Sequence, residues 1–170
     1  MNICNSTIED IDEIFSLYGI ATNFQKGKFS GNVWPQFDRS LIETELKEQR
    51  QFKLLINDTI ACVWAITFSD PQIWEEKDAD PAIYIHRIAT NPNFRGQQFV
   101  IKIVAWAKAY ARSQQKQFIR LDTCGHNEGL IAHYQKCGFT FLGISKIKNA
   151  KGLPSHYNNA DVCYFEIKLS

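Results

Sequence analysis

The chain has 170 residues and a formal net charge of +1, so its charge does not favour nucleic acid or an anionic membrane as a partner. Its apolar fraction of 45% and aromatic fraction of 13% are typical of a folded globular protein, and we expect a single domain spanning 1–170. No apolar run reaches the roughly 18 residues of a membrane span, which argues against a membrane protein.

The first part of the chain predicts a strand, a helix, an irregular segment and a second helix. Residues 2–5 favour a strand, and Ser6 or Thr7 can cap the helix after it. The segment from Gly19 to Asp38 contains two further glycines and a Trp-Pro pair, and it predicts a long loop that helps to shape the substrate pocket. Asp38 can cap the second helix.

Two strands and an acidic excursion follow. Phe52 to Ile56 and Thr59 to Phe68 predict a hairpin around the Asn57-Asp58 turn. The second of these strands is almost continuously apolar, which indicates an interior position. Asp70 to Asp80 is acidic and polar, and we expect it to leave the sheet before the next strand.

The middle of the chain predicts a strand–turn–helix–strand unit. Ile83–Thr90 is a strand rich in branched and aromatic residues, and Asn91 to Gly96 is a turn. Apolar residues at helical spacing predict a helix from Gln98 to Ser113, and Phe118–Thr123 is the next strand. The N-terminus of that helix suits an anion, although on these local residues alone an ordinary strand–helix turn, in which Gly96 supplies a difficult backbone angle, is the better explanation.

The last part of the chain predicts a helix and two strands. The helix opens at Asn127 and ends at Gly138, and Phe139 to Ile144 is a strand. Asn149 to Asn159 is a loop that we expect to border the substrate pocket. Val162 to Leu169 closes the chain as a strand, and we find no internal repeat or linker.

The cysteines and histidines predict neither disulfides nor a metal site. There are five cysteines, an odd number, and none forms a CxxC pair. Together with the lack of a signal peptide, this favours reduced thiols and a cytoplasmic location. Cys124, His126, His133 and Cys137 match no standard zinc spacing, and Cys124 lacks a recognisable base to act as a nucleophile.

Two motifs carry a resemblance to a known family. The first comprises Ile88-Ala89-Thr90 and Arg95-Gly96, and the second places Tyr134, Lys136, Gly138 and Phe139 at fixed intervals after Asn127. Together they resemble the GNAT family of acyl-CoA-dependent N-acetyltransferases over essentially the whole chain. The runs His86-Arg87-Ile88-Ala89 and Arg120-Leu121-Asp122-Thr123 look like those of a bacterial branch of that family.

The resemblance implies a fold and an activity. The fold would be α/β (α+β), with a mixed, mostly antiparallel sheet of six to seven strands flanked by about four helices. Ile83–Thr90 and Phe118–Thr123 would run parallel and splay apart to admit the cofactor. The activity would be transfer of an acetyl group from acetyl-CoA to a primary amine of a small molecule or peptide by direct attack. Family members often pair, so a homodimer is possible.

The resemblance also implies the site residues. Ile88, Ala89 and Thr90 would present backbone groups to the pantetheine arm of coenzyme A, and Tyr134 would protonate the departing thiolate. A phenol with an ordinary pKa of about 10 remains protonated at neutral pH and can do so. The remaining cofactor-binding residues would be Arg95, Gly96, Gln97, Gln98, Phe99 and Val100 in the pyrophosphate turn, with Asn127 and Lys136 on the following helix.

One departure from the family pattern supports a second hypothesis. Gln98 and Val100 stand where the family has two small residues, and glycine there permits a close approach of the pyrophosphate. The alternative is therefore a catalytically weakened module that binds coenzyme A as a sensor or interaction partner.

The base that deprotonates the amine has three candidates. His86, Asp122 and Glu45 are possible, yet each also has a structural interpretation. His86 can be hydrogen-bonded within the sheet, Asp122 can orient a strand end or pair with Arg87 or Arg120, and Glu45 can be a solvated helix charge. The sequence assigns none of them. Trp34, Trp74 and Tyr84 are candidates for an acceptor pocket or for the core.

Overall fold

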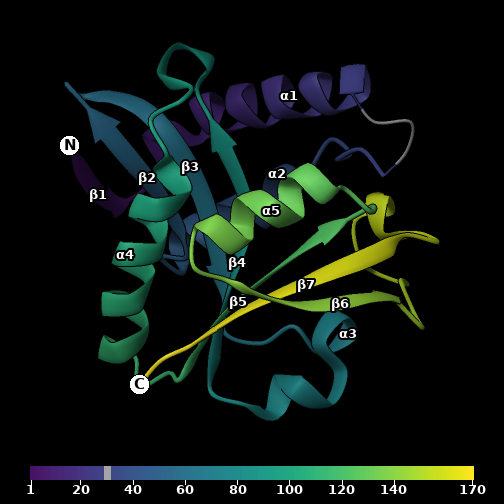
Figure 1. The fold of residues 1–170 in the computed structure, drawn as a ribbon. Coiled ribbons are helices and arrows are strands. Elements are labelled where there is room, and N and C mark those ends of the chain that lie inside the picture. The colour runs from purple at the N-terminus through teal and green to yellow at the C-terminus, as the bar shows by residue number, and fades with distance from the viewer. Residues whose placement is uncertain (29–31) are drawn as a thin grey trace.

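The computed structural model describes residues 1–28 and 32–170, and they build one seven-stranded sheet in the order β1-β2-β3-β4-β5-β7-β6 (Figure 1). All neighbouring strands are antiparallel except β4 and β5, which are parallel. The strands are β1 (Asn2–Asn5), β2 (Gln51–Ile56), β3 (Thr59–Thr67), β4 (Ala82–Thr90), β5 (Phe118–Cys124), β6 (Thr140–Lys146) and β7 (Asp161–Lys168). The helices are α1 (Ile11–Lys28), α2 (Arg39–Lys47), α3 (Pro71–Trp74), α4 (Phe99–Ser113) and α5 (Glu128–Lys136).

The mixed, mostly antiparallel sheet confirms the predicted fold class, and the predicted strands are present. The hairpin between β2 and β3 turns at Asn57 and Asp58, whose φ angles of 47° and 60° are those of a type I′ turn. Within the described residues, no helix combines the length and the apolar character needed to cross a membrane.

The predicted loop from Gly19 to Asp38 is wrong over its first part, because α1 continues to Lys28. Gly19 and Gly27 both lie on exposed sides of this helix, where a missing side chain costs only about 1 kcal/mol of helix stability. The buried face of the helix, which includes Leu17 and Tyr18, outweighs that cost. Residues 29–31 lie outside the described part, and residues 32–38 are irregular, as expected.

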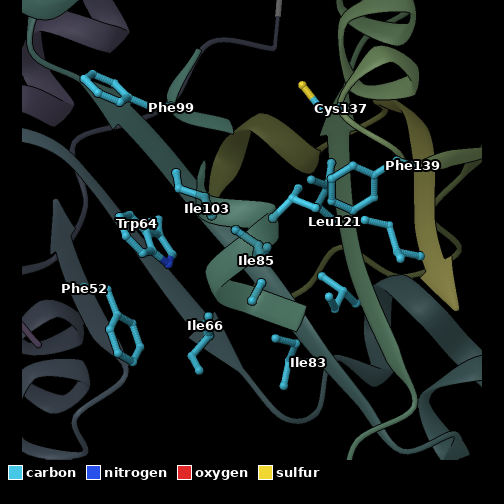
Figure 2. Close-up of a cluster of buried hydrophobic side chains, with 14 of the residues drawn as sticks. Phe52, Trp64, Ile66, Ile83, Ile85, Phe99, Ile103, Leu121, Cys137 and Phe139 are labelled. Carbon is cyan, nitrogen blue, oxygen red and sulfur yellow. The ribbon is translucent and has the colours of Figure 1, made fainter. Parts of the chain in front are cut away.

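The alternation of side chains along β3 divides the core into two layers. Cys62, Trp64 and Ile66 face the cluster that α4 covers, whereas Val63 between them packs with α1 and α2. Figure 2 shows the first cluster, in which side chains from β2 to β5 meet α4 and the end of α5. Because both faces of β3 are buried, its sequence is almost continuously apolar.

A β-bulge interrupts the pairing of β4 with β3. Val63 pairs with Ala89 and Ala65 with His86, so one residue of β3 faces two residues of β4. Those two residues are Arg87 and Ile88, and Arg87 has a φ of 53°, in the left-handed region. A bulge leaves its extra residue outside the ladder and redirects the strand.

The parallel strands β4 and β5 pair over three residues only and then diverge. Their register ends at Tyr84 and Arg120, after which β4 pairs with β3 alone and β5 with β7 alone. The sequence-based expectation of two splayed parallel strands is therefore confirmed. A gap between the strands opens from this point toward their carboxyl ends.

Arg120 lies at the point of divergence and is fully buried. Its Nε donates to Glu166 of β7 at 2.8 Å, and its other nitrogens donate to the Asp80 carboxylate and to the backbone carbonyl of Lys77. The guanidinium also stacks over Trp74 at 5.0 Å. One side chain thus joins the acidic excursion from 70 to 80 to the centre of the sheet.

We expect Arg120→Met to destabilise the fold by about 3–5 kcal/mol, because two carboxylates then lose their buried partner. Chemical denaturation of the variant and the wild type measures the difference. Arg39→Met is the control, since Arg39 pairs with Asp12 and Glu43 on the surface and its loss costs about 1 kcal/mol or less. Equal stability losses in the two variants would contradict the role of Arg120.

Candidate active site

The gap between β4 and β5 opens into a cleft of about 1380 Å³. This volume exceeds the roughly 300–1000 Å³ of ordinary small-ligand pockets and leaves room for two substrates. The cleft is bordered by α1, by residues 32–41, by the ends of β4 and β5, by α5 and by the loop residues 152–157. Both segments that the sequence placed at the substrate pocket therefore reach it.

The cleft brings together six of the residues that the sequence analysis assigned to the cofactor or to catalysis. Three come from β4, at the bulge and beyond it, and the others come from the following turn and from α5 with its N-cap. These six are Ile88, Ala89, Thr90, Arg95, Asn127 and Tyr134. The side chain of Arg95 is exposed, and its guanidinium lies 4.9 Å from the centre of the Phe24 ring.

The remaining residues of the turn lie beside the cleft and are not part of its lining. Gly96 has a φ of 80°, and Gln98 has a φ of 54° at the N-cap of α4, so both occupy the left-handed region. Gln97 is exposed on the turn between them. Phe99 is buried in the core and Val100 packs against it, which leaves only their backbone groups available to a ligand.

Helix α5 and its N-cap bring two motif residues, Asn127 and Tyr134, to the cleft, but not the third, Lys136. Asn127 is the N-cap, and its Oδ1 accepts a hydrogen bond from the Leu130 backbone N–H at 3.0 Å. Tyr134 lines the cleft with its ring packed on Phe165 at 5.1 Å. Burial raises the pKa of Tyr134, so its phenol stays protonated. Lys136 is exposed in the last turn of α5 and does not line the cleft.

Of the three candidate bases, Glu45 has a structural role. It is buried, and so it is not the solvated helix charge considered above. Its side chain is buried and pairs with the guanidinium of Arg87 and, at 3.9 Å, with that of Arg50. Arg87 in turn stacks over Phe37 at 5.2 Å. Glu45 is therefore the ion-pair partner of Arg87, whose side chain projects from the β4 bulge.

His86 lies against Asp70, a residue that the sequence analysis did not single out. The Nε2 of His86 is 3.4 Å from Oδ2 of Asp70 and 3.3 Å from Oγ1 of Thr67. Burial lowers the pKa of His86 to about 3 and, aided by the Asp122 charge, raises the pKa of Asp70 to about 8. The short distance suggests an ion pair, but both pKa shifts favour the neutral forms, with the proton on Asp70.

Asp122 does not pair with an arginine. Its Oδ2 accepts a hydrogen bond from the hydroxyl of Tyr157 at 2.8 Å, and Arg87 and Arg120 are held by other carboxylates. Its Oδ1 is buried and has no partner within the described residues. Burial raises the pKa of Asp122 to about 6, so the carboxylate is ionised at neutral pH but binds a proton readily.

Asp70, His86 and Asp122 bring their side-chain ligand atoms within 4.8 Å of one another. This is a geometry that can hold a cation, either a metal ion or the ammonium group of a substrate. The sequence did not identify Asp70 and Tyr157 as site residues, because neither belongs to a local motif. Of the three aromatic residues considered for an acceptor pocket, Trp34 lines the cleft, whereas Trp74 and Tyr84 are buried in the core outside it.

Comparison with known proteins agrees with this geometry. Residues 17–139 match the acetyltransferase (GNAT) family. A curated relative, the uncharacterized N-acetyltransferase YesJ of Bacillus subtilis (strain 168), is 30% identical over 74 residues, which cover 44% of this chain and only 41% of that protein.

Solved structures share the fold. A GNAT-family acetyltransferase from Listeria monocytogenes 4b F2365 superposes with a TM-score of 0.79 at 20% identity, covering 99% of this chain and 94% of that one. The protein yncA from Salmonella typhimurium, solved with its cofactor acetyl-CoA, superposes with a TM-score of 0.69 at 12% identity, again over 99% and 94% of the two chains. The family match covers more than half of the sequence, and the chain belongs to the GNAT family of acetyltransferases.

Proposed function

We propose that this chain transfers an acetyl group from acetyl-CoA to a primary amine of a small molecule or peptide, by direct attack of the amine in a ternary complex. The observation that carries the proposal is the divergence of β4 and β5. It brings a protonated phenol, Tyr134, and an unsatisfied carboxylate, Asp122, to one cleft beside the β4 bulge.

The residues at one end of the cleft fit acetyl-CoA. Lys28 and Arg95 supply positive charge there, and α4 directs its N-terminal backbone N–H groups toward the adjoining turn. Ile88, Ala89 and Thr90 offer strand backbone, at the bulge and beyond it, for the pantetheine amides. Asn127 adds an amide side chain. When bound, acetyl-CoA supplies the activated acyl group.

Two side chains of the protein handle protons in this proposal. Asp122 accepts a proton from the ammonium form of the substrate, because an amine needs its lone pair to attack the carbonyl carbon. A backbone N–H at the bulge polarises that carbonyl. As the carbon–sulfur bond breaks, Tyr134 donates its proton to the thiolate, and the proton lost by the new amide nitrogen replaces it through solvent.

The proposal also covers the domain organisation, the cellular location and the oligomeric state. Residues 1–170 act as one GNAT-type domain in the cytoplasm of a bacterium, where the reduced state suits the five free cysteines. Pairing of two copies, common in this family, is compatible with the exposed edge strand β6.

Two measurements separate this enzyme from the sensor alternative. Calorimetry with acetyl-CoA tests binding, and thiol release over a panel of amines tests turnover. Binding without turnover over a broad panel would favour a sensor, to which the left-handed Gln98 in the phosphate turn lends support. Absence of binding would overturn both functions.

We expect Tyr134→Phe to lower kcat by about 10²–10⁴-fold with little change in the Kd of acetyl-CoA, because the ring keeps its packing and only the proton donor is lost. A thiol-release assay measures kcat, and calorimetry measures the Kd of acetyl-CoA. Tyr110→Phe, on α4 against Trp106, is the matched control and should leave kcat unchanged. An unchanged kcat in Tyr134→Phe would remove this residue from the acid role.

We expect kcat/KM to fall as the pH drops below about 6, because Asp122 must be ionised to accept a proton. The other titrating groups near it, Asp70 with a pKa of about 8 and His86 with a pKa of about 3, do not titrate at that pH. Asp122→Asn should lose this acid limb together with about 10²-fold of the rate, whereas Asp70→Asn should keep the limb. Persistence of the limb in Asp122→Asn would assign the base elsewhere.

Gln98→Gly tests the phosphate turn. Glycine relieves the left-handed strain, which stabilises the fold by about 1 kcal/mol, and opens the turn to the pyrophosphate, so acetyl-CoA should bind more tightly. Gln49 has nearly the same φ, 55°, at the end of α2 and outside the cleft. Gln49→Gly should therefore raise the melting temperature without changing the Kd. Equal Kd values for Gln98→Gly and the wild type would show that Gln98 does not restrict the cofactor.

A further inference from the structure

The charged side chains divide the cleft into two ends. Lys28 and Arg95 flank the exposed ring of Phe24, at 4.7 and 4.9 Å from its centre, and make one end cationic. Asp70 and Asp122 line the other end. The two other arginines that line the cleft, Arg50 and Arg87, are already paired with the Glu45 carboxylate. We call the end lined by Asp70 and Asp122 the acceptor end. Its carboxyl groups are not neutralised by the arginines of the cleft.

We propose that the acceptor is an amine with no carboxylate beside its amino group, an arylalkylamine or alkylamine in place of an α-amino acid, and that Asp70 and Asp122 make this selection. This inference rests on the proposed acetyl transfer and names its substrate class.

The carboxyl geometry fits an ammonium group. Asp70 and Asp122 stand on different elements, yet their ligand atoms lie within 4.8 Å of each other and of His86. Oδ2 of Asp70 and Oδ1 of Asp122 are buried, and neither has a hydrogen-bond partner in residues 1–28 and 32–170. An ammonium brings three donors and a positive charge to such oxygens. A substrate carboxylate brings no donor and adds a like charge beside the ionised Asp122 in a region of low dielectric. A bound ammonium, in contrast, favours the ionised form of Asp70, which is protonated when the cleft is empty.

The histidines at this end supply no positive charge that would hold a substrate carboxylate. Burial and the charge of Arg87 lower the pKa of His156 to about 4, and His86 has a pKa of about 3 for the same reasons. Both rings are therefore neutral at physiological pH. A carboxylate at this end would meet acids and neutral rings, because the guanidinium groups are committed to Glu45.

His156 gives an independent indication of a ligand. It is 9% exposed, lines the cleft, and its Nδ1 is buried without a partner among the described residues. Its ring meets the edge of Phe37 at 6.4 Å, and Phe37 meets Trp34 at 5.9 Å. These three rings form a largely apolar wall, in which Nδ1 of His156 is a buried polar atom without a partner among the described residues. Such a wall suits the hydrocarbon or aromatic body of an amine.

Matched substrates test the selection. Tyramine and tyrosine, tryptamine and tryptophan, and 3-methylbutylamine and leucine differ within each pair by one carboxylate. Thiol release from acetyl-CoA should give a kcat/KM at least tenfold higher for the member without the carboxylate. Tyrosine methyl ester separates charge from size: it should approach tyramine, and an ester as poor as tyrosine would overturn the electrostatic selection.

Asp70→Asn tests the selecting residue. Removing this acid should reduce the tyramine-to-tyrosine ratio of kcat/KM by at least threefold, whereas Glu43→Gln, on the exposed face of α2, should preserve the ratio. Calorimetric titration of each amine into the protein saturated with coenzyme A gives a second readout, and tighter binding of tyramine than of tyrosine is expected. Equal or reversed preference, or no binding and no turnover with any pair, would overturn the inference.

The same data distinguish failure of this inference from failure of the proposed function. Efficient acetylation of tyrosine or leucine would refute the selection while supporting acetyl transfer. Tighter binding of the carboxylate-free amines without any thiol release would support the selection and refute the transfer.

Discussion

The short parallel pairing of β4 and β5 is the constraint on which the rest of this structure depends. Three residues of each strand are hydrogen-bonded, and the strands then separate. Arg120 holds the paired end together by binding carboxylates from β7 and from the excursion after α3. The bulge at Arg87 turns β4 away at the other end. Because the sheet is closed at one end and open at the other, a large cleft forms within a well-packed fold.

Buried charged groups around this opening are of two kinds, those that are paired with an opposite charge and those that are not. Around Arg120 and around Arg87, guanidinium groups are paired with carboxylates, although Oε2 of Glu45 has no hydrogen-bond partner among the described residues. Around Asp122, the carboxyl groups keep oxygens without partners and have raised pKa values. Unsatisfied buried acids destabilise a fold, so their concentration in one cleft indicates that a ligand or a proton completes them.

Several parts of this site were predictable because their signals are local. The strand from Ile83 to Thr90, the helix after it and the spacing from Asn127 to Tyr134 follow from residue type and periodicity. The strand and the residues Asn127 and Tyr134 reach the cleft, whereas the helix α4 lies beside it. The extent of α1 was not predictable from its glycines, since the packing of its buried face outweighs their weak local preference. Lys136 shares the motif spacing but points to solvent.

The sequence by itself determined the family, the order of the elements and the pairing of a phenol-bearing helix with a Gly-containing turn. These properties depend on neighbours within a few residues, so propensity and spacing record them. Only the tertiary structure decided which acids face the substrate. Asp70, Asp122 and Tyr157 come from separate elements, and their pKa values depend on burial and mutual contact, which no local pattern records. The same packing leaves Oδ1 of Asp122 without a partner among the described residues, whereas Glu45 is paired with Arg87.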